Sequence, residues 1–115
     1  TANEQLTFGK GYDHNYVLNT TGETLKPAAK ISGDQSGIVM EVFTEEPGLQ
    51  FYSGNFMESK NTFKTGAKDD FRTAFALEKQ HFHDAPNQPE FPSIVLKPGE
   101  TFTSTSVYKF SVTKT

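Results

Sequence analysis

The sequence predicts an all-β fold in which antiparallel sheets pack as a sandwich. Short runs of alternating side chains recur along the chain, turn residues separate them, and no stretch of helical length carries an apolar stripe at i, i+3, i+4 and i+7. Eleven phenylalanines and four tyrosines, with no tryptophan, suit a β-rich core or a ring-stacking site equally well. We find no repeat and no domain boundary, so residues 1–115 are predicted to form a single β-sandwich segment.

The first two predicted strands lie in the middle of the chain. The run "GIVMEVFT" (37–44) places Ile38, Met40 and Val42 on one face. The run "LQFYS" (49–53) follows it after a Pro-Gly pair that is typical of a turn. These two runs are expected to be strands that follow one another along the chain, separated by this turn.

Three further runs predict strands in the second half of the chain. "FRTAFALE" (71–78) alternates strictly, and "SIVLK" (93–97) leads into a Pro-Gly pair suited to a type II turn. The last run, "TFTSTSVYKFSVT" (101–113), again alternates apolar and polar side chains. Between them, residues 80–92 contain Pro86, Pro89 and Pro92, which favours a loop of fixed shape.

The composition narrows the range of functions. The formal net charge is −3 and no cluster of Lys or Arg stands out, which argues against a nucleic-acid partner. Without cysteine the chain has neither disulfides nor thiolate metal ligands. No apolar run approaches the ~20 residues of a membrane span, so no membrane partner is expected either.

Glu78 is the leading candidate for a catalytic group. It ends the run 71–78 on the face that also carries Ala74 and Ala76, and these small residues leave room for a ligand. Partial burial would raise the pKa of its carboxyl toward that of a useful general base. The alternative is an ordinary exposed glutamate paired with Lys79 or Arg72.

Asp13 and Gln50 are the leading candidates for binding a ligand. Asp13, His14 and Asn15 come together at a predicted loop-to-strand junction after two glycines, which suits recognition of hydroxyl groups. The alternative there is a turn in which Asp13 and Asn15 bind local backbone. Gln50 shares a strand face with Tyr52, so an amide and an aromatic wall lie together, unless Gln50 is only a polar neighbour of the core.

Metal and nucleophile chemistry have weaker support. His81, His83 and Asp84 lie close together, with His14 elsewhere, but no fourth ligand has a recognisable spacing, so no metal site is predicted. A Ser-His-Asp nucleophile lacks a supporting G-x-S-x-G elbow.

Four stretches in this order resemble the aldose 1-epimerase, or galactose mutarotase, family. They are "GYDHNYVLN", "SGIVMEVFTEEPGLQFYSGNF", "FALEKQHFHDAPNQPEFPSIVLKPGE" and "YKFSV". The resemblance runs from about Gln5 to Val112 and maps to the last third of such an enzyme. It implies the C-terminal part of a galactose mutarotase-like supersandwich.

The resemblance also implies a reaction and its residues. Glu78 would be the general base that takes the proton from the anomeric hydroxyl of a free aldohexose such as galactose or glucose. Asp13 and Gln50 would contact the sugar, and a histidine acid would protonate the ring oxygen. No cofactor is implied. The acid histidine lies before the matched segment in the family, so the expected partner is the N-terminal portion of the same fold.

The chain departs from the family pattern at two places. Lys79 stands where threonine is usual, and His83 stands where proline is common. Alternation along a strand predicts that Lys79 points away from Glu78.

Two other functional classes remain open from the sequence. One is a non-catalytic carbohydrate-binding β-sandwich that uses Asp13, Gln50 and aromatic rings. The other is a glycoside hydrolase with Asp13 and Glu78 as paired carboxylates. The expected location is cytoplasmic, or periplasmic or secreted if an export signal has been removed.

Overall fold

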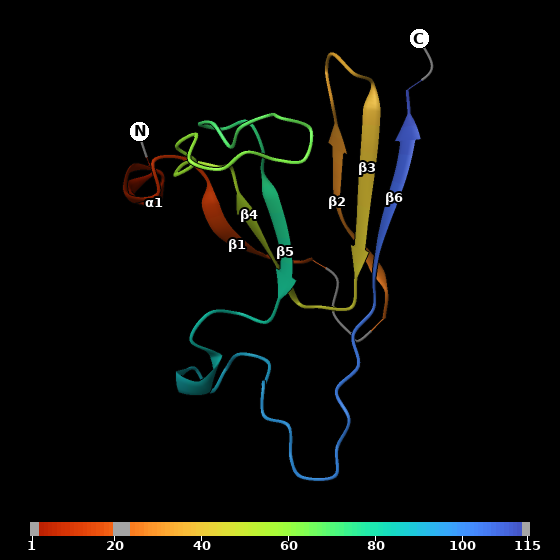
Figure 1. The fold of residues 1–115 in the computed structure, drawn as a ribbon. Coiled ribbons are helices and arrows are strands. Elements are labelled where there is room, and N and C mark those ends of the chain that lie inside the picture. The colour runs from red at the N-terminus through yellow and green to blue at the C-terminus, as the bar shows by residue number, and fades with distance from the viewer. Residues whose placement is uncertain (1–2, 20–23, 114–115) are drawn as a thin grey trace. The chain divides into compact units, whose positions relative to one another are not determined.

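A computed structural model describes residues 3–19 and 24–113. Its elements in chain order are α1 (Glu4–Phe8), β1 (Asp13–Val17), β2 (Lys26–Ser32), β3 (Ile38–Thr44), β4 (Gly48–Tyr52), β5 (Ala76–Gln80), the short 3-10 helix η1 (Ala85–Asn87) and β6 (Ser106–Val112). Figure 1 shows these elements along the chain.

The predicted all-β class is confirmed. The strands form two three-stranded antiparallel sheets, with the orders β1-β4-β5 and β2-β3-β6 (Figure 1). The chain divides into two compact units, of which the first contains Thr1–Tyr16 and Leu49–Glu78 and the second contains Val17–Gly48 and Lys79–Thr115.

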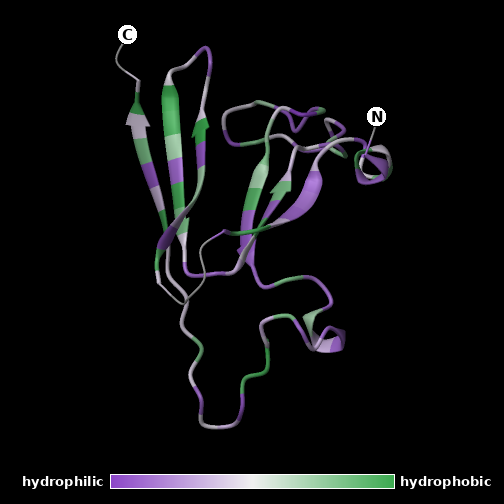
Figure 2. Ribbon diagram, turned by 180° about the vertical axis from the view of Figure 1, so that it is seen from behind, coloured by the Kyte–Doolittle hydropathy of each residue, from purple (hydrophilic) through white to green (hydrophobic). Residues whose placement is uncertain are grey.

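In the second unit, β3 is the central strand of its sheet. It pairs antiparallel with β2 and with β6, so that Met40 lies between Ile31 and Phe110. Val39 and Val42 are both buried although their side chains point to opposite faces. The mostly hydrophobic colouring of β3, interrupted by a hydrophilic band, is visible in Figure 2. A central strand buried on both faces is consistent with this apolar sequence.

In the other sheet, β1 and β4 are joined by backbone hydrogen bonds just beyond their ends. The Ser53 amide donates to the Tyr12 carbonyl over 3.0 Å, and the Leu18 amide donates to the Pro47 carbonyl over 3.0 Å. Residue numbers rise on one strand as they fall on the other, which is the antiparallel arrangement. This pairing fixes which residues of β1 and β4 lie opposite one another.

The predicted strand 71–78 is wrong in its first half. Residues 71–73 form a turn and the strand β5 begins only at Ala76. The Asp70 side chain accepts from the Phe71 amide over 2.8 Å, and the Thr73 hydroxyl donates to the Asp70 carbonyl over 2.7 Å. These local bonds compete with a strand, and they coincide with a left-handed φ of 55° at Arg72.

The C-terminal strand predictions are only partly correct. Residues 93–97 and 101–105 are not strands, and β6 begins at Ser106. The turn between them is confirmed, since Gly99 has a φ of 87° and the Glu100 amide donates to the Lys97 carbonyl over 3.0 Å. This is the hydrogen bond and the glycine conformation that a type II turn requires.

The 3-10 helix η1, helix α1 and strand β2 were not predicted. Helix α1 has five residues and is capped by Asn3, whose side chain accepts from the Gln5 amide over 2.8 Å. It is too short to show helical periodicity. Strand β2 contains Pro27, next to which its pairing with β3 shifts register. Proline is rare in strands, although it is tolerated at such an irregularity on an edge strand. Residue propensities therefore do not predict a strand here.

The loop after β5 contains η1 and a contact between two aromatic rings. The Phe82 and Phe91 rings meet edge to face with centroids 5.2 Å apart, and Pro86 lies in η1. Among the described residues, no helix is long and apolar enough to cross a membrane.

Candidate functional site

Three adjacent strands of one sheet each carry one of the predicted site residues. Asp13 is the first residue of β1, Gln50 lies in the middle of β4, and Glu78 lies in the middle of β5. The strand order is β1-β4-β5, and all three residues belong to the first compact unit. Side chains far apart in the sequence are therefore carried by one small sheet.

Asp13 and Gln50 are in direct contact. The Gln50 Nε2 group donates to Asp13 Oδ1 over 2.8 Å. Gln50 is buried, with 8% of its surface exposed, whereas Asp13 is exposed. A buried amide that holds an exposed carboxylate leaves the remaining carboxylate lone pairs directed at solvent, where a hydroxyl can donate to them.

Aromatic contacts show which face of the sheet these residues occupy. The Phe51 ring lies 5.6 Å from Tyr12 and 6.2 Å from Phe75, centroid to centroid. Side chains alternate between faces along a strand, so the neighbours Asp13 and Gln50 project to the face opposite these rings. Phe75 immediately precedes β5, and the same alternation places Glu78 on the face of Asp13 and Gln50.

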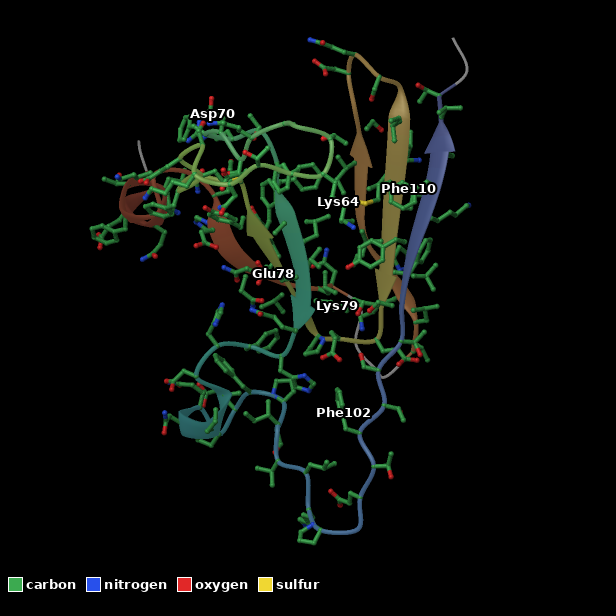
Figure 3. All side chains as sticks on the ribbon, in the orientation of Figure 1. Lys64, Asp70, Glu78, Lys79, Phe102 and Phe110 are labelled. Atoms are coloured by element: carbon green, nitrogen blue, oxygen red, sulfur yellow. The ribbon has the colours of Figure 1, made fainter. Side chains whose placement is uncertain are left out.

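Glu78 is exposed in this chain (Figure 3), so the expected partial burial is absent. Neither of the pairings expected for an ordinary glutamate is present in the described part of the chain. Arg72 donates to the Lys10 carbonyl over 2.7 Å, and the Lys79 ammonium lies 5.6 Å from the centre of the Tyr108 ring. Both residues lie in β5, so alternation directs Lys79 to the face opposite Glu78.

Asp13, His14 and Asn15 lie within β1, so the prediction that they precede the strand is wrong. The His14 Nδ1 atom accepts from the Asp13 amide over 3.2 Å. The His14 ring lies 5.7 Å from Tyr12 and 6.5 Å from Tyr16. His14 thus belongs to the aromatic face, while Asp13 belongs to the other.

The remaining histidines have partners in the second unit. His81 Nδ1 lies 2.7 Å from Glu46 Oε2, and the Glu46 side chain also accepts from the Ser104 hydroxyl. His83 Nε2 lies 3.1 Å from the Gln80 side-chain nitrogen. Within residues 3–19 and 24–113, no three His, Cys, Asp or Glu side chains are grouped as metal ligands would be.

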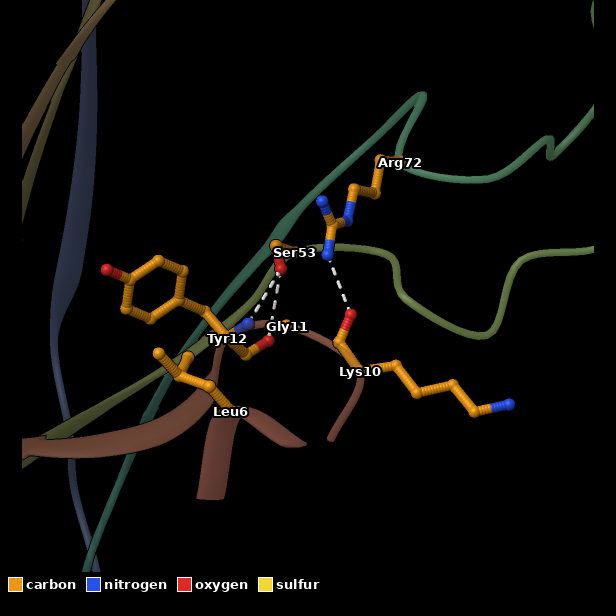
Figure 4. A pocket seen from close by; sticks show the side chains of 6 residues that line it. All are labelled: Leu6, Lys10, Gly11, Tyr12, Ser53 and Arg72. Atoms are coloured by element: carbon orange, nitrogen blue, oxygen red, sulfur yellow. Dashed lines mark hydrogen bonds between the residues drawn. The ribbon is translucent and has the colours of Figure 1, made fainter. Parts of the chain in front are cut away.

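A cavity of about 450 Å³ lies beside α1 in the first unit and is separate from the three site residues (Figure 4). It is lined by Leu6, Lys10, Gly11, Tyr12, Ser53 and Arg72. The sequence did not predict that Ser53 and Arg72 lie near the segment that leads into Asp13. The "SGN" triplet after β4 is the signal that could have drawn attention to them.

Comparisons with known proteins agree on one family. The aldose 1-epimerase family matches residues 1–109. The galactose mutarotase of Rattus norvegicus is 43% identical over 102 residues, which are 89% of this chain and 30% of that protein. The aldose 1-epimerase of Escherichia coli K12 is 38% identical over 103 residues, which are 88% of this chain and 30% of that protein.

A solved structure is similar as well. The GalM/aldose epimerase homologue from C. elegans matches with a TM-score of 0.74 and 26% identity, covering 90% of this chain and 30% of that one. The chain thus spans about 30% of the length of these relatives. Because the family match extends over almost all of the sequence, the chain belongs to the aldose 1-epimerase family.

Proposed function

We propose that the protein interconverts the α and β anomers of free aldohexoses such as galactose and glucose, with Glu78 as the general base. The observation that carries the proposal is the 2.8 Å hydrogen bond from Gln50 to Asp13, on a sheet whose third strand bears Glu78. The family membership supports the same reaction, since two relatives bear the names galactose mutarotase and aldose 1-epimerase.

In this proposal Asp13 and Gln50 bind the sugar. Asp13 accepts hydrogen bonds from sugar hydroxyls, and Gln50 fixes the orientation of the carboxylate while contacting the sugar itself. Gln50 loses little conformational freedom on binding because it is already buried and hydrogen-bonded. The two proposed sugar-binding side chains are therefore already held together before the sugar arrives.

Glu78 then starts the chemistry. Its carboxylate takes the proton from the anomeric hydroxyl, while an acid protonates the ring oxygen and the ring opens. Rotation about the C1–C2 bond and closure on the other face give the opposite anomer. On opening, the bond between C1 and the ring oxygen breaks as the C1 carbonyl forms. On closure that bond re-forms, Glu78 returns its proton to the C1 oxygen, and the acid recovers its proton from the attacking hydroxyl, so acid–base catalysis assists both steps.

The proposed acid is a histidine from a portion of the fold that the 115 residues do not contain. The chain spans about 30% of the relatives' length, which leaves room in such proteins for a further catalytic group. None of His14, His81 and His83 is proposed as the acid. His14 belongs to the aromatic face, and His81 and His83 are engaged by Glu46 and Gln80.

Anomer exchange of freshly dissolved α-D-galactose and α-D-glucose tests the proposal. The rate is followed by NMR with the protein, with Glu78→Gln, and with Glu90→Gln, which changes an exposed glutamate outside the site. We expect exchange above buffer for a form of the protein that includes the rest of the fold, and for the Glu90→Gln variant of that form. Loss of a general base should lower the rate by roughly 10²- to 10⁴-fold in Glu78→Gln.

The outcomes also separate the other functional classes. Saturable sugar binding with no exchange, in this chain and in a longer form that includes the rest of the fold, would replace the proposal with a binding module. Release of reducing sugar from a glycoside would replace it with a hydrolase.

A further inference from the structure

We propose that Asn55 is a positioning residue for sugar binding, acting through the backbone of Tyr12 on Asp13. This inference rests on the proposed function only in so far as Asp13 binds the sugar. Asn55 is almost fully buried, with 3% of its surface exposed, and both polar atoms of its side-chain amide form hydrogen bonds. Its Nδ2 group donates to the Tyr12 carbonyl over 2.8 Å, and its Oδ1 accepts from the Ser53 hydroxyl over 2.7 Å.

Tyr12 is held at both of its backbone groups. The Tyr12 amide donates to Ser53 Oγ over 3.1 Å. The Tyr12 carbonyl receives the Ser53 amide over 3.0 Å and the Asn55 side chain over 2.8 Å, which fills both oxygen lone pairs. The Ser53 hydroxyl has one hydrogen, and its shorter contact is to Asn55 at 2.7 Å rather than to the Tyr12 carbonyl at 3.2 Å.

Arg72 forms further hydrogen bonds to the same segment and to Asn55. Its Nη2 donates to the Lys10 carbonyl over 2.7 Å (Figure 4). Its Nε lies 3.4 Å from Asn55 Oδ1. We call the side chains of Ser53, Asn55 and Arg72, together with the Lys10–Tyr12 backbone that they hold, the Tyr12 clamp. All of its members lie in the first compact unit.

Gly11 shows how closely the clamp fits. It has a φ of 147°, and a Cβ atom there would overlap Asn55 Oδ1 and lie 2.8 Å from Arg72 Nη2. The clamp therefore requires glycine at this position for space as well as for conformation. The residue after Tyr12 is Asp13, whose carboxylate meets Gln50 on the neighbouring strand.

These contacts explain why Asn55 should matter to the sugar. The position of an aspartate carboxylate depends on the position of its backbone. The Tyr12 clamp holds the residue that precedes Asp13, and so it fixes the Asp13 backbone on its N-terminal side. If the Tyr12 carbonyl were released, the hydrogen bond between Gln50 and Asp13 would lose its geometry without any change in either side chain. A displacement of about 1 Å at such a group is enough to impair ligand binding.

Asn55→Asp is the variant that separates these contacts. It keeps the oxygen that accepts from Ser53 and Arg72, but it places a second oxygen against the Tyr12 carbonyl. Asn3→Asp is the matched control, because an aspartate can still cap α1 at that position. Arg72→Ala releases the Lys10 carbonyl at an exposed position, and it serves as the second variant if Asn55→Asp does not fold.

The first measurement does not depend on activity. The side-chain amide signals of Gln50 are recorded by NMR in the protein, in Asp13→Ala and in each clamp variant. We expect Asn55→Asp and Arg72→Ala to move these signals toward their positions in Asp13→Ala, and Asn3→Asp to leave them unchanged. Unchanged Gln50 signals in a folded clamp variant would overturn the proposal.

The second measurement is a double-mutant cycle on the affinity for galactose. We expect Asn55→Asp to raise the Kd roughly 3- to 10-fold in the protein and to change it little in the Asp13→Ala background. An equal loss in both backgrounds would mean that Asn55 has only a structural role. If the protein shows neither binding nor exchange, the proposed function fails, while the Gln50 signals still decide whether the clamp positions Asp13.

Discussion

At the scale of single residues, the site depends on one polar contact that joins two strands. Gln50 is buried and directs its amide to Asp13, so it combines the role of a satisfied polar residue in the core with that of a proposed sugar contact. The alternative considered from the sequence, that Gln50 is only a polar neighbour, is correct about its burial. It is incomplete because the partner of Gln50 is a carboxylate exposed to solvent.

The close fit around Gly11 can be tested by measuring the free energy of unfolding of a Gly11 variant. Both Gly11 and Gly66 have positive φ, but a Cβ atom at Gly66 would meet nothing within 4 Å. Gly66→Ala should therefore cost about 1 kcal/mol from backbone strain alone. Gly11→Ala adds overlap with Asn55 and should cost roughly 1–3 kcal/mol more.

Denaturant unfolding of the two glycine variants and the unsubstituted protein measures this difference. Equal losses of stability in Gly11→Ala and Gly66→Ala would show that the clamp leaves room for a methyl group. The tight fit inferred around Gly11 would then be wrong.

At the scale of elements, the success of prediction follows the strength of the local pattern. The strands β3 and β4 were expected at nearly their observed bounds because their apolar runs are bounded by turn residues. Alternation in 71–75 was just as regular, but the Asp70 side chain and the Arg72 backbone form a turn there instead. Local hydrogen bonds of this kind are invisible to a count of alternating residues.

Part of the candidate site could likewise be predicted from the sequence and part could not. Asp13, Gln50 and Glu78 were predicted as site residues from residue type, strand position and resemblance to a family. The Tyr12 clamp was not found, because Ser53 and Asn55 meet Tyr12 only through the pairing of β1 with β4. β1 ends at Val17 and β4 begins at Gly48, so no hairpin turn between them fixes this register, and the sequence of either strand alone does not give it.

The loop after β5 gives a prediction about pH. Hydrogen bonds from the Gln88 and Asn87 side chains hold the pKa of Asp84 below its ordinary value. Because the folded pKa is depressed, the stabilisation is fully present above the ordinary aspartate pKa of about 3.9 and is lost as the pH falls through the lower folded value. Gln88→Ala should raise the Asp84 pKa toward the ordinary value.

Carboxyl ¹³C NMR of Asp84 measures this titration directly. Gln35→Ala, at an exposed turn position between β2 and β3, is the matched control and should leave the Asp84 pKa unchanged. A Gln88→Ala variant that titrates like the unsubstituted protein would show that the Gln88 bond does not stabilise the Asp84 carboxylate.

At the scale of the whole molecule, the described residues bury little apolar surface. The buried hydrophobic residues are Val39, Val42, Leu49 and Ala85, whereas Phe110 and Val112 on the edge strand β6 are 66% and 67% exposed. Exposed apolar side chains on a sheet edge favour association. The 115-residue chain alone should therefore bind a hydrophobic dye and associate as its concentration rises.

Phe110→Thr tests this expectation, because threonine keeps β propensity and removes the ring. The variant should bind less of a dye such as anilinonaphthalene sulfonate and should scatter less light than the unsubstituted chain. Strong dye binding that Phe110→Thr leaves unchanged would place the association surface elsewhere. A chain that stays monomeric and binds no dye would contradict the expectation itself.

The central claim is that Glu78 performs the chemistry while Asp13 and Gln50 hold the sugar. The measurement that tests it most directly is magnetisation exchange between the α and β anomeric protons of galactose at equilibrium, combined with the galactose Kd, for the protein and for Glu78→Gln. The account predicts that Glu78→Gln falls to the exchange rate of buffer while its Kd stays within about 3-fold of the unsubstituted protein. Exchange that survives in Glu78→Gln would contradict the account, because the proton would then be taken by another group.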